Sequence, residues 1–227
     1  MMVRGRPWPI VTAVRLSGAA AILIAIVATH LDVASRGPVN PFNLYGYFTV
    51  QSNLIGAGAL LATASTRLAR RAHSVPLGLF RALAATCLAI VGIVYAVLLA
   101  PLGVAGGVPV PWANTVLHIV SPILVTADWV LVGDRPRLPR ARTWLILLYP
   151  AGWTGVVLIR GATDGWVPYP FLDPAQGYGV VALYCLAILV LFVGMSLAVL
   201  RISRSHGLVL RSNDPPVLTQ APARRER

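Results

Sequence analysis

Six long apolar stretches joined by short polar connections constrain this chain more than any other feature. At 1.5 Å per residue, a helix of about 20 residues crosses the roughly 30 Å of hydrocarbon in a bilayer. We therefore expect an all-α, polytopic integral membrane bundle of six transmembrane helices, forming one domain over residues 1–200. The predicted spans lie near Ile10–His30, Leu44–Thr66, Ala82–Leu102, Ala113–Val132, Thr143–Ile159 and Tyr178–Leu200.

The composition agrees with a lipid-covered exterior. Hydrophobic residues make up 57% of the chain and charged residues only 11%, with a mean hydropathy of +0.74. Soluble domains carry about 25% charged residues, so this chain has too few to cover a water-facing surface. The net charge of +12 would otherwise suggest nucleic acid. We expect membrane lipids as partners instead, and no nucleic acid.

The basic residues are distributed unevenly between alternate connections. Seventeen of the 19, all of them arginine, fall in the N-terminal segment, the second and fourth connections and the tail; only Arg36 and Arg160 fall on the other side. Short arginine-rich loops stay in the cytoplasm. The pattern predicts a protein of the cell membrane with both ends in the cytoplasm. Residues 201–227 are predicted to form a basic, disordered tail near anionic headgroups.

The second span begins with an unusually polar segment, residues 45–56. At 100° per residue, five positions of this segment share one helical face, and Asn43 is positioned to cap the helix. Polar groups in lipid must find partners, so this face is a candidate site. Its residues are Tyr45, Thr49, Ser52, Asn53 and Gly56.

The fourth span carries Asn114, His118, Ser121 and Pro122 on one face. Thr49 and His118 each lie about five residues past their predicted helix starts, roughly 8 Å below the outer boundary. If the two helices are neighbours, the hydroxyl and the imidazole can meet. Asn114, one turn above, is the better candidate to orient the imidazole.

Asp128 lies ten residues beyond His118, about 15 Å deeper in the membrane, and cannot complete a triad with it. We expect Asp128 to reach the inner interface or to pair with an arginine such as Arg135.

The same polar residues allow a simpler interpretation. Threonine, serine and asparagine in membrane helices often serve as interhelical hydrogen-bond contacts worth about 1 kcal/mol. An intramembrane histidine is rarer and is a functional candidate by default.

Several motifs together resemble one family. Residues 47–53 (Tyr-Phe-Thr-Val-Gln-Ser-Asn), Asn114 with His118, Asp128-Trp129, Tyr149-Pro150 and residues 169–174 (Tyr-Pro-Phe-Leu-Asp-Pro) are similar to the androgen-induced and androgen-dependent TFPI-regulating membrane proteins, in their bacterial six-helix branch. Characterised animal members hydrolyse fatty acid esters of hydroxy fatty acids with a threonine nucleophile and a histidine. The resemblance implies that Thr49 and His118 hold these roles.

These observations lead to a hypothesis for catalysis without a cofactor. His118 accepts the proton of Thr49 Oγ1 while this oxygen attacks a lipidic ester, and water later releases the acyl group. Donors for the developing oxyanion are expected from Tyr45, Ser52 and Asn53.

Three alternatives remain. The first is a non-enzymatic sensor, scaffold or small-solute carrier. The second is a haem protein ligated by His30 and His118. The third is a metal-dependent hydrolase, although its candidate ligands lack motif spacing: His30, Asp32, His118, Asp164 and Asp173.

Overall fold

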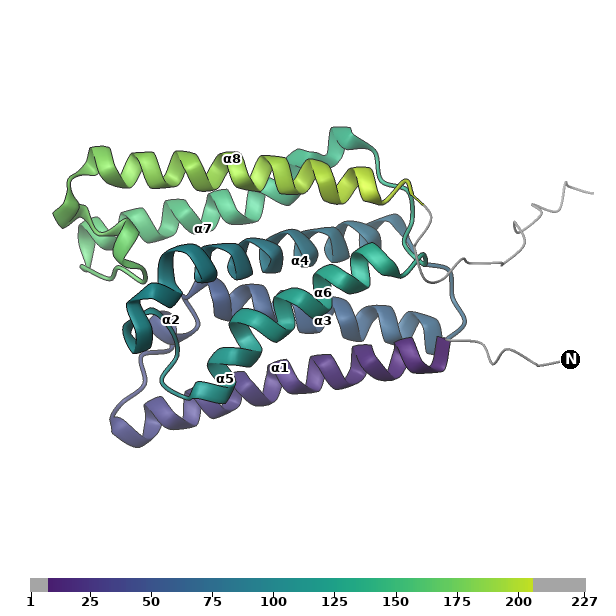
Figure 1. The fold of residues 1–227 in the computed structure, drawn as a ribbon, viewed down its shortest axis with the longest axis horizontal. Helices are drawn as coiled ribbons and strands as arrows, with labels where there is room; N and C mark the ends of the chain where they lie inside the picture. The colour runs from purple at the N-terminus through teal and green to yellow at the C-terminus, as the bar shows by residue number, and fades with distance from the viewer. Residues whose placement is uncertain (1–7, 206–227) are drawn as a thin grey trace, which may run out of the picture.

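The computed structural model describes residues 8–205, and the regular elements in that range are helices. The all-α class is therefore confirmed, while the tail predicted over residues 206–227 lies outside the described residues. Long helices run alternately in opposite directions, so α1 begins and α8 ends at the same end of the bundle (Figure 1). The α-helices are α1 (Trp8–Arg36), α2 (Pro41–Leu44), α3 (Phe48–Leu68), α4 (Val75–Val94), α5 (Pro111–Thr115), α6 (Ser121–Leu131), α7 (Thr143–Thr163) and α8 (Tyr178–Ile202).

Two π-helical turns interrupt the long helices close to the site described below. The first, η1 (Tyr95–Leu99), continues α4 and leads into the 3-10 segment η2 (Ala100–Gly106). The second, η3 (Val116–Val120), joins α5 to α6. Turns of this kind often occur at functional positions in helices. The remaining 3-10 turns are η4 (Arg140–Arg142), η5 (Pro170–Leu172) and η6 (Pro174–Gln176).

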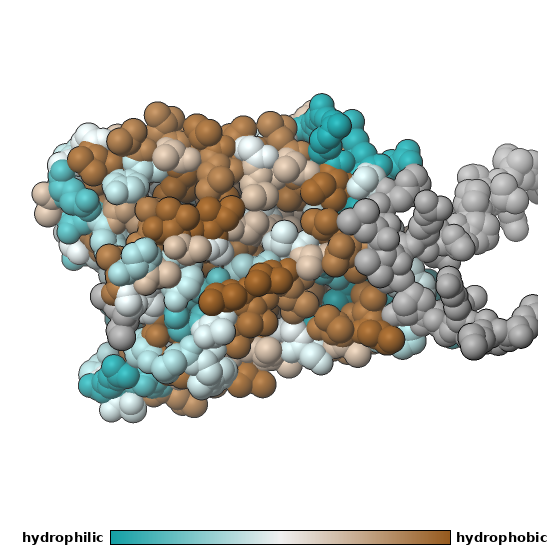
Figure 2. Space-filling model, viewed as in Figure 1, coloured by the Kyte–Doolittle hydropathy of each residue, from teal (hydrophilic) through white to brown (hydrophobic). Residues whose placement is uncertain are grey.

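Five helices within residues 8–205 are long and apolar enough to cross a membrane. They are Trp8–Arg36, Val75–Gly103, Pro111–Leu131, Arg140–Thr163 and Tyr178–Ile202. Helix α3 is 21 residues long but is more polar, because it carries the segment expected to form the site. Figure 2 shows hydrophobic side chains across the middle of one face, with hydrophilic ones toward its ends.

Helices α3 and α4 pack together at the centre of the bundle. Helix α1 packs against α3, α6 and α8 pack against α4, and α7 packs against α8. Fully buried alanines line these contacts, among them Ala19, Ala57 and Ala85. Small residues let helix backbones approach closely, which is the usual packing mode in membranes. Because α3 lies inside this packing, its polar side chains meet other helices.

The second predicted span begins later than expected. Residues 41–44 form the separate helix α2, which is capped by the side chain of Asn40. Helix α3 then begins at Phe48, with Tyr47 at its N-cap position. The prediction that Asn43 caps this span is therefore wrong, because α2 and the turn that follows it separate Asn43 from α3. Asn43 instead accepts a hydrogen bond from Arg160.

Candidate functional site

The hydroxyl of Thr49 and the ring of His118 are in contact. Thr49 Oγ1 lies 3.3 Å from His118 Nε2. Both residues are buried, with 6% and 4% of their surface exposed. Thr49 is the second residue of α3, and His118 lies within η3. The contact expected from the sequence is confirmed.

Contrary to the prediction, Thr49 and His118 do not lie at equal offsets from their helix starts. Thr49 lies one residue after Phe48, and His118 lies seven residues after Pro111. The two side chains meet because the helices begin at different levels, since α2 and its turn delay the start of α3.

The carbonyl group of Asn114 determines how the imidazole is protonated. His118 Nδ1 lies 3.2 Å from the Asn114 carbonyl oxygen. A carbonyl can only accept, so Nδ1 carries the proton and Nε2 presents its lone pair to Thr49. The Asn114 side chain donates to the hydroxyl of Tyr95 at 2.8 Å. The Tyr95 ring stacks on the imidazole at 4.3 Å, so Asn114 orients the ring both directly and through Tyr95.

Tyr169 contacts Thr49 from the other side, a role that was not predicted. Its hydroxyl lies 3.4 Å from Thr49 Oγ1 and accepts a hydrogen bond from the Thr49 backbone N–H at 3.3 Å. Burial raises the pKa of Tyr169 to about 12, which keeps the phenol protonated at neutral pH. The aromatic and proline-rich run 169–174 was a signal, but helical periodicity cannot position a loop residue.

Of the three residues expected to donate to the developing oxyanion, Tyr45 and Asn53 have other hydrogen-bond partners, and the Ser52 hydroxyl has none among the described residues. Tyr45 precedes α3 and therefore does not share its face. Its hydroxyl lies 3.1 Å from His30 Nδ1 of α1. Ser52 is fully buried and faces Cys87 of α4. Asn53 Nδ2 donates to the carbonyls of Thr49 and Leu117.

The prediction that Tyr45 shares a helical face with Thr49 is wrong, because α3 begins at Phe48. The donor role expected of Ser52 and Asn53 stays a prediction. Asn53 also has a structural role. Its Oδ1 accepts a hydrogen bond from Ser121, and together with the bond to Leu117 this joins α3 to the helix that carries His118.

An apolar cavity of about 450 Å³ lies beside Thr49, between α4, α7, α8 and the loop that contains Tyr169. Its size is typical of small-molecule sites. Thr49 and Tyr169 line it together with apolar side chains such as Ile90 and Phe192. At its rim, Leu186 of α8 is 57% exposed. The cavity therefore connects the Thr49 hydroxyl to the apolar exterior between α7 and α8.

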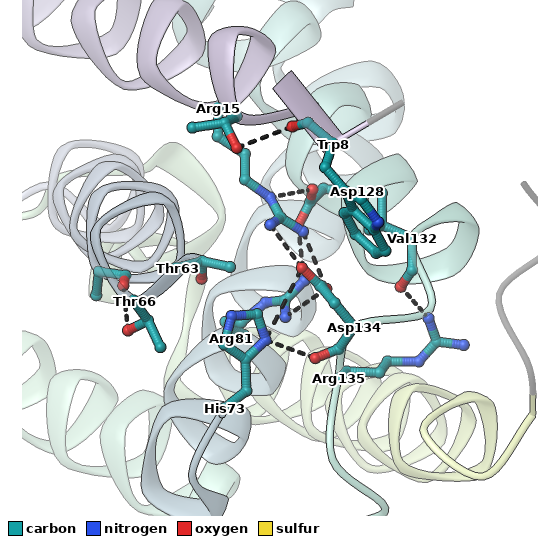
Figure 3. Close-up of polar contacts among 12 residues, drawn as sticks. Trp8, Arg15, Thr63, Thr66, His73, Arg81, Asp128, Val132, Asp134 and Arg135 are labelled. Carbon is teal, nitrogen blue, oxygen red and sulfur yellow. Dashed lines mark hydrogen bonds and ion pairs between the residues drawn. The ribbon is translucent and has the colours of Figure 1, made fainter. Parts of the chain in front are cut away.

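A second polar cluster lies at the other end of the bundle, near the start of α1 and the end of α6, and Figure 3 shows its side chains. Arg15 of α1 and Arg81 of α4 both contact Asp128 of α6 and Asp134, which follows α6, at 2.7–3.0 Å. The side chains of these four residues are at most 11% exposed. His73 joins the cluster by donating to the Asp134 carbonyl.

Asp128 pairs with arginines, as expected, but its partners are Arg15 and Arg81 and not Arg135, the example named from the sequence. Arg135 points away from the cluster and donates to the carbonyls of Val132 and Ile202. Arg15 was counted with the N-terminal segment and Arg81 with the second connection, but both lie inside helices and reach Asp128 from there. No sequence spacing links these positions, because their contacts are tertiary.

The pKa values in the cluster reflect burial and the neighbouring charges. Burial alone would raise the pKa of the Asp134 carboxyl, but the Arg81 and Arg15 guanidinium groups offset this and hold it well below its usual range. Burial lowers the pKa of His73, and the nearby Asp134 opposes that change only in part.

The residues proposed for a metal site do not gather. Within residues 8–205, no three His, Cys, Asp or Glu side chains are close enough to hold an ion. His30 and Asp32 lie near the end of α1, while Asp164 pairs with Arg160 after α7.

Comparisons with known proteins add no assignment. Neither a family model, nor a curated protein, nor a solved structure matches the chain.

Proposed function

We propose that this chain is a membrane-embedded hydrolase of lipidic esters, with Thr49 as the nucleophile and His118 as the base. The observation that carries the proposal is the 3.3 Å contact between Thr49 Oγ1 and His118 Nε2. A hydroxyl is a weak nucleophile unless a base within hydrogen-bond reach removes its proton. The imidazole meets this need because the Asn114 carbonyl leaves Nε2 unprotonated.

The cavity supports a substrate with a long apolar chain. Its walls are mostly aliphatic and aromatic, and its polar groups include the two hydroxyls of Thr49 and Tyr169. An acyl chain placed there would bring its ester carbonyl next to Thr49. Exposed leucines at the rim, such as Leu186 and Leu189, let such a chain enter sideways from lipid.

The reaction proceeds in two halves. Thr49 Oγ1 bonds to the carbonyl carbon while its proton moves to His118 Nε2, and the carbonyl electron pair moves onto oxygen. As the carbon–oxygen bond to the leaving alcohol breaks, Nε2 returns the proton to that alcohol and an acyl-threonine remains. Water then attacks the acyl carbon while the same nitrogen takes its proton. The acid leaves when the bond between that carbon and Thr49 Oγ1 breaks, and Nε2 returns the proton to Oγ1.

The proposal includes six spans with both ends in the cytoplasm of a bacterial plasma membrane. At 21 residues α3 is long enough to cross, and its polar residues pack against other helices, so low hydropathy does not exclude it. The alternating helix directions agree with six crossings, as does the arginine asymmetry. The motif resemblance to the androgen-induced family selects the same threonine and histidine.

Topology can be tested with single cysteines in a background lacking Cys87 and Cys185. An impermeant maleimide should label Asp164→Cys on intact cells and Arg71→Cys only after lysis. Labelling of both positions on intact cells would contradict the predicted orientation.

Activity is tested with p-nitrophenyl esters of short, medium and long fatty acids on purified protein in detergent. Thr49→Ala and His118→Ala should each lower kcat by about four orders of magnitude or more, as removal of a catalytic nucleophile or base does. Thr63→Ala is the matched control, because Thr63 is also a buried threonine of α3 but bonds to the Ala59 carbonyl. Wild-type turnover in folded Thr49→Ala would contradict the proposal.

A further inference from the structure

The hydrogen bonds around Thr49 have a single consistent direction. The Asn114 carbonyl places the proton on His118 Nδ1, so Nε2 accepts from the Thr49 hydroxyl. That hydroxyl has then used its proton and accepts from the hydroxyl of Tyr169. The Tyr169 oxygen in turn accepts from the Thr49 backbone N–H. Two donors, the phenol O–H and this N–H, are therefore gathered at the reacting residue.

The backbone N–H of Thr49 is directed at Tyr169, and not at a carbonyl of its own helix, because of its place in α3. The first N–H groups of a helix have no acceptor within the helix. Tyr47, at the N-cap position, makes no side-chain cap bond that would satisfy them. Thr49 lies in this first turn, where the aligned peptide dipoles also favour negative charge. Its N–H points at the Tyr169 oxygen, at the polar end of the cavity.

The geometry points to Tyr169 as a catalytic residue that stabilises the oxyanion, together with the backbone N–H of Thr49. This inference rests on the proposed hydrolase function and adds the group that the sequence could not identify. A nucleophile's own N–H commonly forms part of an oxyanion hole, as in serine proteases. Here the second donor is a side chain from the loop before α8.

When Thr49 Oγ1 bonds to the ester carbon, its proton passes to His118 and its lone pair becomes the new bond. The Tyr169 O–H then turns from Oγ1 to the adjacent carbonyl oxygen, because that oxygen has gained a negative charge and is the stronger acceptor. When the leaving alcohol departs with the proton from His118, the carbonyl double bond re-forms and the phenol O–H returns. Tyr169 keeps its own proton throughout.

The surroundings of Tyr169 suit this role. Its ring stacks on Phe171 with centroids 5.3 Å apart and an interplanar angle of 4°, which holds the hydroxyl in place. Only 9% of the residue is exposed, so water competes little for its proton. A preorganised donor in such a site acts without reorganising at the moment of reaction.

Tyr169→Phe removes one oxygen and keeps the ring. Loss of one oxyanion donor typically lowers kcat by about 10²–10³-fold, and we expect that loss with little change in KM. A trifluoromethyl ketone, which forms a tetrahedral oxyanion with the nucleophile, should bind more weakly by a similar factor, whereas a product fatty acid should bind as in the wild type. Tyr149→Phe is the matched control, because its hydroxyl bonds to Gln51.

A second variant keeps the test decisive if Tyr169→Phe unfolds. Trifluorotyrosine at position 169 preserves the ring and hydroxyl but lowers the phenol pKa. The alkaline limb of the kcat profile should move to lower pH, because an ionised phenol cannot donate. An unmoved limb, or unchanged ketone affinity in Tyr169→Phe, would overturn the role of Tyr169. If Thr49→Ala is inactive in the same assays, the hydrolase proposal survives that result; if it is active, both fall.

Discussion

Removing the carboxylate of Asp134 should lower the free energy of unfolding of the bundle more than the loss of a surface ion pair does. Asp134 accepts three guanidinium hydrogen bonds, at 2.7 and 3.0 Å from Arg15 and at 2.9 Å from Arg81. Its side chain is 3% exposed, and those of the two arginines are 1% and 4% exposed. Asp134→Ala would leave two buried cations sharing one carboxylate, Asp128.

The magnitude follows from these contacts. Three hydrogen bonds to charged groups would amount to about 5–9 kcal/mol if each contributed its usual 1.5–3 kcal/mol independently. Breaking one side of a buried ion pair typically costs about 3–5 kcal/mol, since the structure relaxes and water enters. We expect the lower range, which is still a large fraction of the 5–15 kcal/mol that holds most proteins together.

The free energy of unfolding can be measured by reversible titration with SDS in mixed micelles. Asp32→Ala is the control, because Asp32 pairs with Arg36 on the surface, where the two side chains are 25% and 62% exposed. Such a pair contributes about 0.5 kcal/mol or less. The double variant Arg15→Leu/Asp134→Ala should lose less than the sum of its single variants, because Arg81 and Asp128 remain balanced. A loss for Asp134→Ala no larger than for Asp32→Ala would refute the reasoning.

Three further predictions concern the cavity, pH and the link between helices. A Cβ at Gly155 meets open space in the cavity, so the larger side chain of Gly155→Leu should fill part of it. This variant should lose turnover of long-chain esters and keep turnover of short ones. Turnover is measured against ester chain length, with Gly152→Leu on the exposed face of α7 as the control. The pKa of His73 is lowered in the folded protein, so the unfolded state binds more protons and stability should be lost as pH falls below about 6.5. In His73→Gln, the free energy of unfolding measured by titration should change less with pH in that range. Asn53→Ala should lower kcat by about tenfold or more in the ester assay, because α3 loses its bonds to the segment carrying His118.

The elements best predicted from the sequence were those governed by local patterns. Apolar length located the long helices to within a few residues at most boundaries, and helical periodicity brought out Thr49 and His118. These signals work because each depends on residues close together in the chain. The delayed start of α3 was missed, since Asn40 capping a separate short helix competes with Asn43 in the same polar segment.

Features that depend on tertiary contact could not be predicted in this way. The π-turn that carries His118 has no sequence rule, and Tyr169 reaches Thr49 from a loop 120 residues later in the chain. The partners of Asp128 lie 113 and 47 positions away, so an arginine closer in sequence, Arg135, was favoured wrongly. Long-range pairing of charges is decided by how the helices pack.

The most direct test of the central claim is to locate the covalent adduct left by an activated phosphonate ester. After reaction with a fluorophosphonate, tandem mass spectrometry of the digested protein should find the phosphonyl group on Thr49, and His118→Ala should suppress its formation. An adduct on another residue, or an equally modified Thr49 in folded His118→Ala, would contradict the account.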